Sequence, residues 1–174
     1  MRLTFSTDSV VVVAGIPGAG KTTLIRRTVD RSAVRVVDTD DHRRRVPALM
    51  YAEHYLRIVL AVAGRRPAVI HSRGTHAFLR RAIAVLARLR GRDAHLLLLD
   101  ADRDEAEAGQ RRRGRVIAPA EMAWHAVRWR RLMARRPVAE GWTSGVVLDR
   151  ERAASTSAIE FPAAREARLL PATM

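Results

Sequence analysis

The most informative segment of the chain is a run of valines that leads straight into a glycine-rich turn. Residues 9–14 read Ser-Val-Val-Val-Val-Ala, and residues 15–22 read Gly-Ile-Pro-Gly-Ala-Gly-Lys-Thr. A continuous β-branched run is typical of a strand buried on both faces of a parallel sheet. The turn has the spacing G-x-x-x-x-G-K-S/T, and a helix is predicted after it from Lys21 to about Val29. Strand, turn and helix together predict a phosphate-binding loop.

A loop of this spacing supplies the groups that a triphosphate needs. Glycines allow backbone N–H groups to turn inward onto phosphate oxygens, and the following helix directs its positive end at the same anion. Lys21 is expected to reach the β- and γ-phosphates, and the Thr22 hydroxyl to complete the coordination of a magnesium ion. The sequence thus predicts bound ATP and Mg2+, with Thr22 as metal ligand. The predicted nucleotide-binding residues are Gly15, Pro17, Gly18, Ala19, Gly20, Lys21, Thr22 and Thr23.

Short apolar runs alternate with helical patterns along the rest of the chain. Strands are predicted at residues 9–14, 33–37, 68–72, 95–99 and 146–148. Further helices are predicted from Pro47 to Gly64, from a Thr75 cap to Gly91, from an Asp102 and Glu105 capping box to about Gly114, and from Pro119 to before Pro137. This alternation predicts an α/β fold, a single three-layer domain with a mainly parallel five-stranded sheet. We expect this domain in residues 1–150, with an arginine-rich lid at about 103–118, and a C-terminal helix or tail in 151–174.

The composition excludes several other classes of protein. There are no cysteines, so disulfide frameworks and thiolate metal sites are ruled out. The first apolar run, residues 10–14, is far too short for a membrane span or a signal peptide core. From these observations we expect a cytoplasmic protein without a membrane partner. The sequence leaves open whether the protein is a monomer or a homodimer.

The charge of the chain is strongly basic, with a formal net charge of +14. Clustered arginines bind phosphates, so this charge is compatible with a nucleic-acid partner. A coding bias toward arginine is an equal alternative, because arginine is abundant throughout the chain. Lys21 is the only lysine in the sequence, and it falls where a phosphate-binding loop requires one.

Among proteins with such a loop, small kinases fit best. A guanine-specific switch protein reads its base with an Asn-Lys-x-Asp segment, and this chain has no second lysine. Transporter and ring ATPases need longer chains. The chain resembles the zeta-toxin and polynucleotide-kinase-like group of P-loop kinases over residues 10–148. The resemblance rests on residues 15–23, on Thr-Asp-Asp-His-Arg at 39–43, and on Arg-Arg-Arg-Gly-Arg at 111–115.

The resemblance implies roles for residues outside the loop. The carboxylate matching Asp40 is the general base toward the acceptor hydroxyl, and the arginine matching Arg43 helps to hold the acceptor. The segment at 111–115 resembles a lid, whose candidate catalytic arginines are Arg112, Arg113 and Arg115. Cationic lid residues would stabilise the charge that develops on the transferring phosphate. The alternatives are helix capping for Asp40 and a solvated basic helix end for the arginines.

One feature departs from that group. Its members carry an aspartate near magnesium at the end of the third strand, where this chain has His71-Ser-Arg73. Asp100, which ends an apolar run, is either a more distant magnesium partner or a residue preceding a helix. The first hypothesis is therefore an ATP-dependent kinase that phosphorylates a hydroxyl of a small molecule or nucleic-acid end. The second is a regulatory protein that binds or slowly hydrolyses ATP, and the third, based on charge alone, is a nucleic-acid-binding module.

Overall fold

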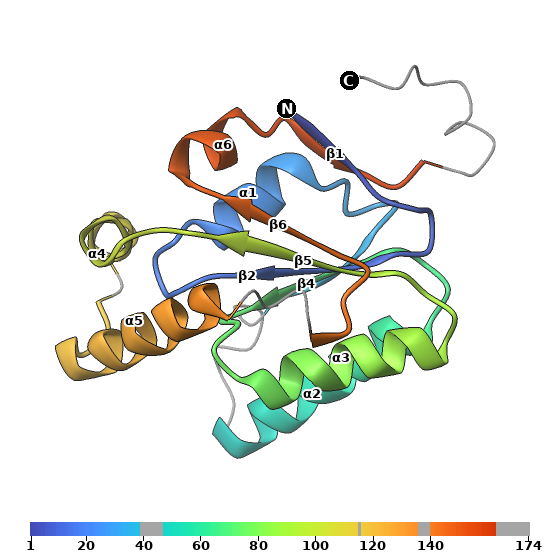
Figure 1. Ribbon diagram of the computed structural model, residues 1–174, viewed down its shortest axis with the longest axis horizontal. Coiled ribbons are helices and arrows are strands. Elements are labelled where there is room, and N and C mark those ends of the chain that lie inside the picture. The colour runs from blue at the N-terminus through green and yellow to red at the C-terminus, as the bar shows by residue number, and fades with distance from the viewer. Residues whose placement is uncertain (39–46, 115, 136–139, 163–174) are drawn as a thin grey trace.

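Five parallel strands form the central sheet of the computed structural model, in the order β3-β4-β2-β5-β6 (Figure 1). The structure describes residues 1–38, 47–114, 116–135 and 140–162. Within them the strands of this sheet are β2 Val10–Ala14, β3 Arg35–Val37, β4 Ala68–Ser72, β5 Ala94–Leu99 and β6 Ser144–Leu148. The all-valine part of β2 lies at the centre, hydrogen-bonded on both sides and fully buried. The predicted five-stranded α/β fold is confirmed.

Helices cover both faces of this sheet. The described helices are α1 Lys21–Thr28, α2 Pro47–Ala63, α3 Ala77–Leu89, α4 Arg103–Arg112, α5 Pro119–Ala134 and α6 Arg150–Ser155. Figure 1 shows α1 and α6 on one face and α2, α3 and α5 on the other. None of the helices in the described ranges is long and apolar enough to cross a membrane.

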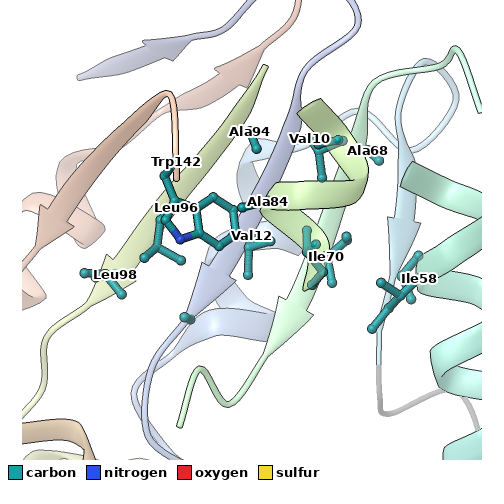
Figure 2. Packing of buried hydrophobic residues seen from close by; sticks show 14 of the residues in the cluster. Val10, Val12, Ile58, Ala68, Ile70, Ala84, Ala94, Leu96, Leu98 and Trp142 are labelled. Carbon is teal, nitrogen blue, oxygen red and sulfur yellow. The ribbon is translucent and has the colours of Figure 1, made fainter. Parts of the chain in front are cut away.

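The alternation of side chains along β2 divides the core into two clusters. Val10 and Val12 pack toward α2 and α3, whereas Val11 and Val13 pack toward α1. Figure 2 shows side chains of the first cluster, which includes Leu96 of β5 and Trp142 from the segment before β6. Because both faces of β2 are buried, the strand that precedes the glycine-rich turn has little freedom to move. The turn is therefore held by the most buried strand of the fold.

Several boundaries follow the sequence prediction, whereas β3 begins two residues later and β6 two residues earlier than predicted. Helix α2 ends before Gly64, β4 has the predicted bounds, and the capping box joins Asp102 to Glu105. The predicted Thr75 cap is wrong. The residue before α3 is His76, which makes no side-chain capping bond, and the Thr75 side chain turns inward and is buried after the left-handed residue Gly74.

A second, two-stranded sheet joins the two ends of the described chain. Strand β1 Arg2–Thr4 pairs in parallel with β7 Ala158–Glu160, and the Phe5 amide donates to the Glu160 carbonyl at 3.0 Å. Phe5 and Ile159 join the buried cluster on the α1 side. Neither strand was predicted, because residues 2–4 and 158–160 form no continuous apolar run.

Candidate functional site

The loop between β2 and α1 has the backbone geometry of a phosphate cradle. Gly18 and Gly20 have φ values of 94° and 95°, in the left-handed region that favours glycine. Gly20 is the N-cap of α1, and no acidic residue lies in the first helical turn. The positive end of α1 therefore faces the loop without a competing carboxylate from its own first turn.

Lys21 lies across this loop. Its ammonium donates to the carbonyl oxygens of Gly15 at 2.6 Å and Ile16 at 2.9 Å, and the residue is buried. Thr22 is buried beside it, whereas Thr23 is exposed. The one lysine of the chain thus lies within the turn, at the point where a triphosphate would enter.

Helix α4 packs directly on the loop through two glycines. A Cβ on Gly109 would lie 2.3 Å from the Gly18 carbonyl oxygen, and a Cβ on Gly18 would lie 2.0 Å from the Ala106 carbonyl oxygen. Gln110 Nε2 donates to the Pro17 carbonyl at 3.0 Å, and its Oε1 accepts from the Ile117 amide at 2.9 Å. The predicted lid is therefore anchored to the loop by backbone contact and by one buried amide side chain.

Two cavities meet at the loop. The larger, of about 400 Å³, lies between α1, α4 and the segment after β6, and its lining includes Thr23, Arg112 and Asp149. The smaller, of about 160 Å³, is lined by Lys21 and Thr22, among others. Three lining residues belong to both, namely Gly18, Gly20 and Arg113. Arg113 Nη2 donates to Thr23 Oγ1 at 2.7 Å, which holds this arginine over the start of α1.

The floor of the smaller cavity carries a buried histidine. His71, near the end of β4, lines the cavity, and its Nδ1 lies 2.5 Å from Asp38 Oδ1. Asp38 is 2% exposed. Such a contact fixes the orientation of the imidazole, with the Asp38 carboxylate behind it. His71 belongs to the segment at the end of β4 where the resemblance led us to expect a carboxylate, and the acid that the structure shows beside it is Asp38, the residue after β3.

The remaining predicted residues fall into two groups. Asp40, Arg43 and Arg115 lie outside the described residues. Arg73 lines the smaller cavity, and its guanidinium lies 3.5 Å from the Glu121 carboxylate of α5. Asp100 is exposed and accepts from Trp129 Nε1 at 2.9 Å, so its carboxylate is joined to α5.

The electrostatic surroundings of the smaller cavity are positive. Burial and then the Arg73 charge lower the pKa of His125, a residue of α5, and the opposing effect of Glu121 is smaller. The charge of Lys21 also contributes to lowering this pKa. Lys21 of the loop and Arg73 therefore place positive charge near His125 of α5, as expected of a site for an anion.

The donor set at the loop fits a magnesium ion that arrives with a nucleotide. Magnesium in nucleotide sites keeps much of its coordination from phosphate oxygens and water. The protein offers the Thr22 hydroxyl at the start of α1. In the part of the chain that the structure describes, no group of three or more histidine, cysteine, aspartate or glutamate side chains could hold a metal alone.

Three residues at the site were not predicted as functional residues. His71 had been noted only as part of the segment that lacks the expected carboxylate, and Gln110 gave no signal. Gly109 lies inside a helix, where glycine is unfavourable by about 1 kcal/mol relative to alanine. A glycine inside a helical pattern indicates close backbone contact, and this signal could have identified the contact with the loop.

Comparison with known proteins agrees with this geometry. A family model described as an AAA domain matches residues 10–138. The structure of the PezAT chromosomal toxin–antitoxin system of Streptococcus pneumoniae aligns with 87% of this chain and 71% of its own, with 14% sequence identity and a TM-score of 0.62. No curated protein matches the sequence significantly.

Two kinases have the same fold. A gluconokinase from Sinorhizobium meliloti 1021 aligns over 83% of this chain and 84% of its own, with 14% identity and a TM-score of 0.55. A fungal RNA kinase aligns over 83% and 75%, with 14% identity and a TM-score of 0.54. At these identities the likeness shows a shared P-loop kinase-like fold.

Proposed function

We propose that this chain, which belongs to the AAA domain family, is an ATP-dependent phosphotransferase that moves the γ-phosphate of ATP to a hydroxyl group. The observation that carries the proposal is the pair of cavities that meet at Gly18, Gly20 and Arg113. The larger cavity is proposed to take the nucleoside part of ATP. The smaller one is lined by Lys21 and Thr22 and also by His71 and Arg73, so it is proposed to take the transferring phosphate and the acceptor hydroxyl beside it.

The larger cavity suits the nucleoside part of ATP. Its volume of about 400 Å³ falls within the usual range for small-molecule sites. Its walls combine the apolar side chains of Leu24 and Leu148 with the polar side chains of Asp149 and Arg27. An apolar wall with a few polar groups is suited to a purine and its ribose. Arg112, which lines this cavity, is proposed to contact the phosphates.

The smaller cavity suits the transfer itself. Lys21 and Thr22 from the start of α1 line it, together with His71 and Arg73 from the end of β4 and the residue after it. The acceptor oxygen would bond to the γ-phosphorus as the bond from phosphorus to the departing ADP oxygen breaks. The charge that spreads over the equatorial oxygens would be met by Lys21 and by Arg113. When bound, Mg2+ neutralises part of the triphosphate charge.

The proton of the acceptor hydroxyl requires a base. Asp40 is our first candidate from the sequence, with Arg43 holding the acceptor and Arg115 completing the lid. His71 is a second candidate, because it lines the cavity and Asp38 orients its ring. An imidazole held by a carboxylate is a common general base.

One observation favours a different function. The end of β4 offers His71, Ser72 and Arg73 in place of the carboxylate expected near magnesium. A protein without that carboxylate can bind ATP and change conformation without transferring phosphate. This second candidate is a regulatory ATP-binding protein.

Label transfer separates the two candidates. The protein is incubated with ATP labelled at the γ-phosphate, Mg2+, and a panel of RNA and DNA ends, nucleosides, sugars and aminoglycosides. We expect label on one class of acceptor and none with Lys21→Ala. Tight ATP binding with label released only as inorganic phosphate would favour the regulatory protein.

A further inference from the structure

Residues of α3 and α5 and of the segments beside them line a broad hollow. Both helices lie on the sheet face opposite α1 (Figure 1). The volume of the hollow is about 1190 Å³, and none of its lining residues lines either cavity at the loop. The charged residues around it are Arg80, Arg81, Arg128, Arg131, Arg135 and Glu140. The hollow is thus a separate and strongly basic feature of the surface.

The charge in this hollow is largely uncompensated. Arg80 is buried and neutralised, since its Nε and Nη2 donate to the two Glu140 carboxylate oxygens at 2.9 Å and 2.7 Å. Arg81, Arg128, Arg131 and Arg135 are exposed, and in the described ranges no carboxylate pairs with them. Burial lowers the pKa of His76, next to α3, and the nearby charges of Arg128, Arg73 and Arg80 lower it further. The hollow therefore presents a positive potential to any ligand.

The basic residues of α5 form a stripe with an aromatic side chain at one end. Trp124, Arg128, Arg131 and Arg135 follow one another at intervals of four, three and four residues, which places them along one side of a helix. The stripe is about 16 Å long at 1.5 Å per residue. A single phosphate group would reach only part of it. A chain of phosphates would reach all of it.

Trp124 differs from the other tryptophans of the chain. It is 42% exposed, whereas Trp129 and Trp142 are 3% and 6% exposed. The Arg128 guanidinium lies 4.4 Å from the centre of the Trp124 ring. This cation–π contact holds the arginine at the hollow and lowers the entropy lost when it binds an anion.

The wall of the hollow also contains a buried hydroxyl. Thr75 is 6% exposed, and among the described residues its Oγ1 has no hydrogen-bond partner. Buried polar atoms are nearly always satisfied by protein, water or ligand. Thr75 lines the hollow, and within the described part of the chain its hydroxyl is an unsatisfied polar atom buried directly behind this wall.

We propose that the hollow between α3 and α5 binds single-stranded nucleic acid. Its arginines would contact successive phosphates, and Trp124 would contribute a stacking surface for a base. Arginines combined with an exposed aromatic ring are typical of proteins that bind single strands without sequence preference. A concave surface of this kind does not fit a flat membrane. The site is distinct from the proposed phosphotransferase site and does not require that activity.

The test measures anisotropy of a labelled single-stranded oligonucleotide of roughly 16 nucleotides, without ATP. Arg131→Ala/Arg135→Ala removes two charges from the hollow. Arg130→Ala/Arg26→Ala is the matched control, since it removes two exposed arginines that do not line the hollow. We expect the hollow variant to bind at least about tenfold more weakly and the control to bind like the unaltered protein. The slope of log K against log salt should become shallower by about 1.4, or about 0.7 per lost phosphate contact.

Trp124→Ala and Trp124→Phe test the aromatic component. The alanine variant should bind several-fold more weakly, and phenylalanine should restore much of the loss because it keeps a stacking face. Circular dichroism melting and ATP-analogue binding establish that each variant is folded. Equal weakening by the two double variants would overturn the proposal, because net charge alone would then explain binding. Absence of oligonucleotide binding, or binding only to vesicles of anionic phospholipid, would also overturn it.

Discussion

Gly18 of the phosphate loop and Gly109 of α4 are in backbone contact, so close that a Cβ on Gly109 would lie 2.3 Å from the Gly18 carbonyl oxygen. The neighbouring atom belongs to the backbone and cannot rotate away. The position of α4, which ends at Arg112 and is followed by Arg113, thus depends on Gly109 having no side chain. This relationship connects the proposed lid to the loop that it would close upon.

Gly109→Ala should displace α4 from the loop. Although alanine favours the isolated helix by about 1 kcal/mol, the added methyl group cannot fit. We expect ATP affinity and turnover both to fall by about tenfold or more, measured by titration calorimetry and label transfer. Gly91→Ala is the control, since its φ of 65° causes backbone strain while nothing lies within 4 Å of its Cβ. If Gly109→Ala leaves both quantities unchanged, α4 does not act on the loop.

Arg113→Ala should slow phosphoryl transfer more than it weakens ATP binding. Arginines that meet the transferring phosphate contribute on the order of 10³-fold or more in rate. Arg111→Ala is the matched control, because Arg111 is exposed on the same helix and lines neither cavity. Steady-state kinetics measure kcat for Arg113→Ala and for Arg111→Ala. Similar kcat values would place Arg113 outside the reaction.

Asp40→Asn tests the base predicted from the sequence. Removing a general base should lower turnover by about 10² or more while ATP affinity stays within a few-fold. His71→Ala tests the second candidate in the same assay, although it also removes the contact between His71 and Asp38. Comparable loss of ATP binding in Asp40→Asn would assign that residue to metal binding or to structure instead.

Arg73→Ala should raise the KM for the acceptor or lower kcat while sparing ATP affinity. The guanidinium is a pure donor with a permanent positive charge, so it can hold an anionic group but cannot bind magnesium. Arg73→Asp should likewise fail to improve magnesium-dependent turnover. Titration of each variant, first with an ATP analogue and then with acceptor, measures the two effects. If neither affinity nor turnover changes, the charge of Arg73 serves only its contact with Glu121.

The sequence predicted the parts of the fold that depend on local patterns. The valine run, the glycine spacing of the loop and the Asp102 capping box each carry their signal within a few residues, and each is found in the structure. The pairing of β1 with β7 depends on residues more than 150 positions apart and leaves no such pattern. Long-range pairing of short strands is therefore the part of the fold that the sequence did not reveal.

The candidate site was predictable to a similar extent. The residues of the loop follow from one motif, whereas the contact of His71 with Asp38 joins two strand ends and appears only in three dimensions. The Thr75 cap was predicted from residue type alone, and the turn at Gly74 directs that side chain inward instead. The roles of Asp40, Arg43 and Arg115 remain predictions from the sequence.

The most direct test of the central claim is transfer of labelled γ-phosphate by the unaltered protein and by Lys21→Ala. Because the ammonium acts as a local charge on the β- and γ-phosphates, its loss should abolish transfer and weaken ATP binding while the melting curve keeps its shape. The account predicts labelled acceptor with the unaltered protein and none with the variant. Undiminished transfer by Lys21→Ala would contradict it.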